Sequence, residues 1–152
     1  IVSAQSIDAI LRKYKNDQTA TSIKYQGENL NKAIKSQKKD LKTKLDYIDI
    51  VGFKSDDISA KDKTSIKNVL LTQKYDELIN IKSKEGLVKV STLYKGEIIN
   101  KLYAQFSSKE LGNYYAVLSG NIHLEEISHI VSNLNIKELD FLKTISSGSN
   151  KK

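Results

Sequence analysis

The sequence contains no cysteine, proline, tryptophan or methionine. The absence of cysteine excludes disulfide bonds, thiol catalysis and cysteine-ligated metal sites. No apolar run reaches the length of about 18 residues that a membrane-spanning helix needs, so no transmembrane segment is expected. The P-loop, the dinucleotide-binding glycine pattern and the G-x-S-x-G nucleophile motif are also missing. These absences favour a protein that is not an enzyme.

Arginine is nearly absent, because Arg12 is the single arginine among 25 basic residues. The net charge of +7 favours an anionic partner, such as lipopolysaccharide, phospholipid or an acidic polymer. Nucleic acid is disfavoured, because recognition of phosphates and bases prefers the planar fork of arginine. The alternative is that the lysines only solvate the surface.

The first residues, Ile1-Val2-Ser3-Ala4-Gln5, resemble the end of a secretion signal. Val2 and Ala4 are the small residues expected on either side of Ser3 before a signal-peptidase cut. We therefore expect residues 1–4 to be the tail of an export signal and the protein to reach the periplasm or cell envelope. The alternative is an arbitrary start of the sequence.

The first half of the chain alternates between helical and extended patterns. Ser6 can cap a short helix over residues 6–15, and the β-branched run 19–25 predicts an edge strand. Apolar residues then recur at helical spacing, which predicts a lysine-rich helix over residues 28–45. Residues 46–54 are apolar on both faces, as expected for a central strand, and a helix is expected over residues 60–73.

The second half predicts four strands in a row, over residues 75–83, 87–95, 98–106 and 114–120. Along the strand 98–106, the apolar residues Leu102, Ala104 and Phe106 alternate with Lys101, Tyr103 and Gln105. One face of the sheet is therefore expected to be buried and the other open. After the last strand, Gly120 allows a close turn into a helix with His123 as its N-cap. Glu126 then reaches back to a free amide, and Ile122 packs on Ile127.

This closing corner resembles the domain-of-unknown-function family 4252, small exported proteins of Bacteroidetes-type bacteria. The matching pattern is the strand 114–118, then Ser119-Gly120-Asn121-Ile122, then Leu124-Glu125-Glu126-Ile127-Ser128. The resemblance covers about residues 6–142 and implies an α+β fold and an envelope location, without an activity. We expect a single α+β domain over residues 5–145, with a mostly antiparallel sheet of four to six strands, helices packed on one face, and a disordered tail at 146–152.

The open face of the sheet is the leading candidate for function. Its expected members are Lys89, Ser91, Leu93, Lys101, Tyr103, Gln105 and Tyr115. Tyrosine provides rigid amphipathic contact area, which suits a protein partner, either a second copy in a homodimer or another envelope protein. The alternative is an ordinary sheet with one wet face.

The lysine-rich helix 28–45 is the second candidate, as a contact for an anionic lipid or polymer surface. Its lysine face carries Lys32, Lys35, Lys38, Lys39, Lys42 and Lys44. A merely solvated helix face is the alternative reading.

The sequence offers no arrangement of residues that is typical of a catalytic or metal-binding site. His123 and His129 are six residues apart on one helix, on different sides, and cannot hold one metal ion together. The carboxylate pairs at 56–57 and 125–126 precede or open helices, where the helix dipole accounts for them. We expect no catalytic residue, no metal and no cofactor.

Overall fold

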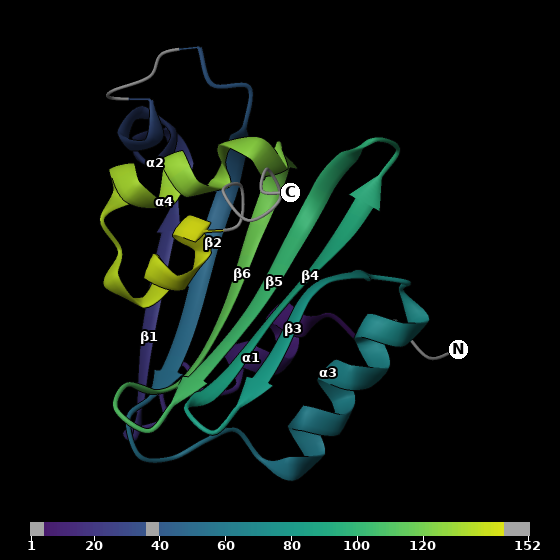
Figure 1. Ribbon diagram of the computed structural model, residues 1–152, viewed down its shortest axis with the longest axis vertical. Coiled ribbons are helices and arrows are strands. Elements are labelled where there is room, and N and C mark those ends of the chain that lie inside the picture. The colour runs from purple at the N-terminus through teal and green to yellow at the C-terminus, as the bar shows by residue number, and fades with distance from the viewer. Residues whose placement is uncertain (1–4, 36–39, 145–152) are drawn as a thin grey trace.

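The computed structural model describes residues 5–35 and 40–144, which form a six-stranded antiparallel sheet with helices (Figure 1). The strands are β1 (Ala20–Gln26), β2 (Lys44–Phe53), β3 (Asp76–Ser83), β4 (Gly86–Lys95), β5 (Ile98–Ser108) and β6 (Gly112–Ile122). Their order is β1-β2-β6-β5-β4-β3, so β6 and β5 hold the middle and β1 and β3 are the edges. This confirms an α+β fold with a mostly antiparallel sheet.

Helices cover both faces of the sheet. One face carries α2 (Gly27–Ile34), η1 (Leu124–Glu126), α4 (Ile127–Leu134) and η2 (Lys137–Thr144). The opposite face carries α1 (Ile7–Arg12) and α3 (Ala60–Thr72), and Figure 1 shows α1 behind the sheet and α4 in front of it. The prediction that helices pack on one face only is therefore wrong.

The two faces hold separate apolar cores. The α2 and α4 side contains Ile48, Leu102 and Leu118, which are neighbours across β2, β5 and β6 in the antiparallel register. The α1 and α3 side contains Phe53 and Tyr103. A second core is required because the strands bury apolar side chains on alternating faces and α1 and α3 each have an apolar side to cover.

The lysine-rich helix predicted over residues 28–45 is much shorter. It ends as α2 at Ile34, and Lys44 already begins β2. Leu45 and Ile48 fall on helical spacing, yet they belong to a strand whose backbone pairs with β6. Asn31 fixes this arrangement, because its amide side chain donates to Leu45 O and accepts from Leu45 N.

The predicted cap of the first helix is confirmed, whereas the predicted turn at Gly120 is not. The Ser6 hydroxyl caps α1 by accepting from the Ala9 amide at 3.0 Å. Gly120 lies inside β6, where β2 approaches so closely that a Cβ would be 2.1 Å from Lys44 O. The predicted hydrophobic pair Ile122 and Ile127 is buried.

Candidate functional site

The residues predicted to form an open sheet face lie beneath α1 and α3. Tyr103 and Tyr115 are each 1% exposed, and Ser91 is also buried. The remaining members, Lys89, Leu93, Lys101 and Gln105, are half-buried. The prediction of an exposed face is therefore wrong, because the apolar sides of α1 and α3 pack on the same side chains.

Four of these residues line a cleft of about 260 Å³ between α3 and the sheet. They are Lys89, Tyr103, Gln105 and Tyr115, and α3 contributes Ile66 and Leu70 among others. The Tyr103 hydroxyl donates to Gln105 Oε1 at 3.2 Å, and the Tyr115 hydroxyl donates to Asp57 Oδ1. Burial raises the pKa of both tyrosines, so both are neutral donors at neutral pH.

Lys101, a further polar member of the predicted face, belongs to a network with Asp8 of α1 and Tyr47 of β2. Lys101 Nζ lies 2.7 Å from Asp8 Oδ2 and 2.7 Å from the Tyr47 hydroxyl, which itself donates to Asp8 Oδ2 at 2.8 Å. Burial by itself lowers the pKa of Lys101, but the bonds to Asp8 and Tyr47 raise it more. For Tyr47, in contrast, burial raises the pKa above the ordinary tyrosine value. Lys101 is thus charged and Tyr47 neutral at neutral pH.

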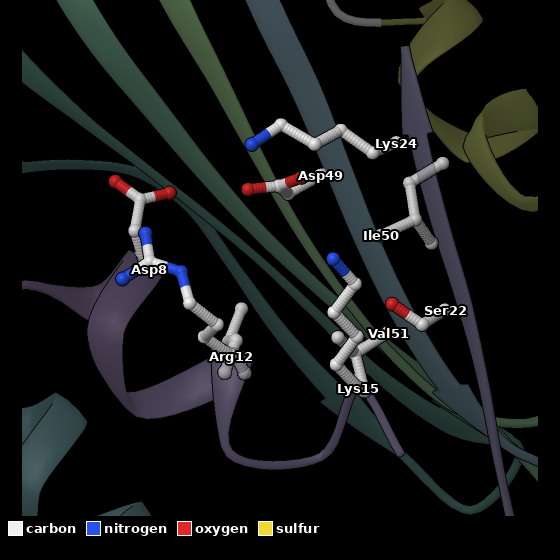
Figure 2. A pocket seen from close by; sticks show the side chains of 9 residues that line it. Asp8, Arg12, Lys15, Ser22, Lys24, Asp49, Ile50 and Val51 are labelled. Carbon is white, nitrogen blue, oxygen red and sulfur yellow. The ribbon is translucent and has the colours of Figure 1, made fainter.

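A small charged cavity opens beside this network, between α1, β1 and β2 (Figure 2). Figure 2 shows Arg12 and Lys15 rising from the α1 side, with Lys24 and Asp49 coming from the strands. Burial raises the pKa of Asp49, while Lys24 is the main opposing influence. The cavity measures about 50 Å³, whereas ligand pockets span roughly 300–1,000 Å³. Its volume suits a few water molecules rather than a substrate.

Sequence reasoning did not find Asp8, Tyr47 or Asp49 as members of one polar cluster. Asp8 lies 93 residues from Lys101 in the chain, and no motif spacing connects helix α1 with β5. The available signal was a charged side chain, Lys101, on a strand near the middle of the predicted sheet.

The predicted lysine site is partly assembled by the structure. Lys32 of α2, Lys35 directly after α2 and Lys44 of β2 line a hollow of about 520 Å³ together with Glu28 and Asn31. Lys42 is exposed in the preceding loop, and Lys38 and Lys39 lie outside the described residues. We call Lys32, Lys35, Lys42 and Lys44 the lysine end. Within the described part of the chain, none of the four forms an ion pair.

Glu126 has a different partner from the one predicted. Its carboxylate accepts from the backbone amides of Lys42 at 3.0 Å and Thr43 at 2.8 Å, while the amide of His123 donates to Thr43 Oγ1. The predicted capping box is therefore wrong, and Glu126 instead anchors the loop that carries the lysine end. Burial by itself raises the pKa of Glu126, but these amide bonds lower it below its ordinary value of 4.5.

Replacement of Glu126 with glutamine is expected to lower stability at neutral pH and to make stability less sensitive to acid. A carboxyl group whose pKa is lowered by folding stabilises the protein above its unfolded pKa, and this contribution is lost as the pH falls through the folded pKa. Thermal unfolding measured from neutral pH to below 4.5 checks this. Glu125→Gln, at an exposed neighbour, serves as the control and should preserve the acid sensitivity of the native protein.

Residues 5–35 and 40–144 contain neither a cluster of metal ligands nor a helix that could cross a membrane. No group of three or more His, Cys, Asp or Glu residues in this part is arranged to hold a metal ion. No helix there has both the length and the apolar character needed to cross a bilayer. His123 precedes η1 without a side-chain capping bond, and His129 lies 3.2 Å from the Asn133 amide.

A six-stranded antiparallel sheet with helices on both faces and a polar network beneath α1 defines an α+β domain. The family model "Domain of unknown function (DUF4252)" matches residues 13–130, and the chain belongs to this family. The match includes all six strands, whereas α1 and η2 lie outside it. No curated protein and no solved structure matches the chain.

Proposed function

We propose that the protein is a non-catalytic module of the cell envelope that binds an anionic lipid surface through the lysine end. The observation that carries this proposal is the convergence of Lys32, Lys35 and Lys44 on one hollow. The three lysines come from α2, from the residue that follows it and from β2, and Glu28 is the one acidic residue among the described residues that line the hollow. Such a concentration of charge attracts phosphate-bearing headgroups.

The scaffold beneath the lysine end is well anchored. Asn31 ties α2 to β2 through two hydrogen bonds to Leu45, and Glu126 holds the amides of Lys42 and Thr43. A rigid backbone lowers the entropy lost when the lysines engage a surface. No aromatic side chain is found among the described residues that line the hollow, so binding should depend on charge and remain at the surface of the lipid.

The titration behaviour of the buried network supports a non-catalytic role. Efficient general acids and bases have pKa values near the working pH. In this protein the pKa of Lys101 and of Tyr47 is raised, away from neutrality. Partner binding through the sheet face would require Tyr103 and Tyr115 to be uncovered, and both are buried.

Replacement of Lys32, Lys35 and Lys44 with glutamine is expected to weaken vesicle binding by roughly a hundredfold, because each lysine near an anionic surface contributes about 1 kcal/mol. The measurement is co-sedimentation with vesicles of phosphatidylglycerol and phosphatidylcholine in equal parts. Binding of the native protein should fall steeply as salt is added, since counter-ions screen exposed charges.

The matched control replaces Lys61, Lys67 and Lys109 with glutamine, which gives the same net charge. These lysines are exposed on α3 and on the turn between β5 and β6, and their loss should affect binding much less. Equal losses in the two triple variants would show that net charge alone attracts the protein. Vesicle binding that does not depend on salt concentration, or no binding by the native protein, would contradict the proposed function.

A further inference from the structure

The edge strand β3 has an open flank. Seven of its eight residues are exposed, and only Ile79 is half-buried. Leu78 is 40% exposed and Ile81 is 57% exposed, which makes this strand a concentration of exposed apolar side chains. An edge strand also presents unpaired backbone amides and carbonyls, and these can pair with another strand.

The charges of this edge are ordered along the strand. Asp76 and Glu77 stand at its start, whereas Lys82 is its last residue but one and Lys84 follows in the turn to β4. Two copies placed antiparallel bring Asp76 and Glu77 of each copy close to Lys82 and Lys84 of the other. We infer that β3 is the dimerisation edge of the protein and that its partner is a second copy of the chain.

A two-fold axis at Asn80 gives the most complementary register. Ile79 of one copy then lies opposite Ile81 of the other, on the same face of the joined sheet. Because the register shift between Glu77 and Ile79 adds one residue to the strand, Glu77 lies opposite Lys82. Cross-strand pairs of apolar and of oppositely charged residues are the pairs that stabilise antiparallel sheets. Such an interface is self-complementary and closed, as two-fold dimers require.

Other pairings of the edges lack this complementarity. A parallel β3 pair would set acidic residues beside acidic residues and lysines beside lysines, which is destabilising. The other edge strand, β1, has Lys24 as its single charged residue and offers no opposite charge to a second copy. The register shift between Glu77 and Ile79 further restricts which strands can add to β3.

Reversal of the charges at one end of β3 tests the pairing. One variant carries Asp76→Lys with Glu77→Lys, and the other carries Lys82→Glu with Lys84→Glu. Each variant alone should dissociate at least about tenfold more readily than the native dimer, because attraction at both ends becomes repulsion. An equimolar mixture of the two should form a heterodimer, because every charge pair is then opposite again. Sedimentation velocity over a range of concentrations measures each state.

The variant Glu97→Lys with Glu110→Lys is the control, because both residues are exposed in other turns and the net charge matches that of the first variant. It should dimerise like the native protein. Circular dichroism verifies that each variant is folded. A native protein that is monomeric at every concentration, a dimer that withstands both reversals, or a mixture that stays monomeric would each overturn the inference.

Discussion

Replacing Tyr103 with alanine is expected to destabilise the folded protein by about 3–5 kcal/mol, the usual effect of deleting a buried aromatic side chain. Tyr103 is 1% exposed and packs in the core beneath α1 and α3. The truncated side chain would leave a cavity between β5 and these helices. Chemical denaturation followed by circular dichroism should show the midpoint moving strongly to lower denaturant.

Two tyrosine variants separate packing from other effects. Tyr103→Phe keeps the ring and removes only the hydrogen bond to Gln105, so a loss of about 0.5–1.5 kcal/mol is expected. Tyr94→Ala, at a residue that is 45% exposed on the neighbouring strand, should change stability by about 0.5 kcal/mol or less. An unchanged midpoint for Tyr103→Ala would mean that the covered face is open in solution.

Replacing Lys101 with alanine is expected to destabilise the protein by about 3 kcal/mol, because it leaves the Asp8 carboxylate buried without its counter-charge. The Asp8 side chain is 8% exposed, and that of Lys101 is 24% exposed. Because the Lys101 side chain is partly exposed, the expected loss of stability lies at the lower end of the about 3–5 kcal/mol that breaking a buried ion pair costs. Asp8 Oδ1 has no hydrogen-bond partner among the described residues, so Asp8 depends strongly on Lys101.

Removing the charges of both Asp8 and Lys101 should destabilise the protein less than removing Lys101 alone. The variant Asp8→Asn with Lys101→Met keeps an acceptor for Tyr47 and leaves no unpaired charge, so it should recover much of the loss. A double-mutant cycle at neutral pH measures the coupling. The raised pKa of Lys101 means that its contribution persists through neutral pH and is lost only as the pH rises above the ordinary lysine value of 10.5. Additive losses would contradict this coupling.

The strands could be predicted from the sequence because their side-chain periodicity is local. The alternation of Leu102, Ala104 and Phe106 with polar neighbours predicts β5, and the observed strand is Ile98–Ser108. The same alternation did not show what lies above the second face. Tyrosine and lysine side chains fit a wet surface as well as a covered one, because each has a long apolar part.

A signal for the second layer was nevertheless present. The strand β2 is apolar on both faces, and Val51 and Phe53 both belong to the core beneath α1 and α3. A strand of this kind requires cover on both sides of the sheet. The lysine-rich helix was overpredicted for a related reason, because Leu45 follows helical spacing while its position is fixed by pairing with Gly120 of β6.

The order of strands in the sheet has a consequence for folding as the chain is made. β2 pairs on its inner side with β6, so that Ile48 lies opposite Leu118, seventy residues later. The antiparallel pair of β1 and β2 therefore has no further partner strand until nearly the whole domain has been synthesised. Pairings of such long sequence separation are slow to form. A chain that stops before β6 would expose the inner edge of β2, the side most prone to join a foreign strand.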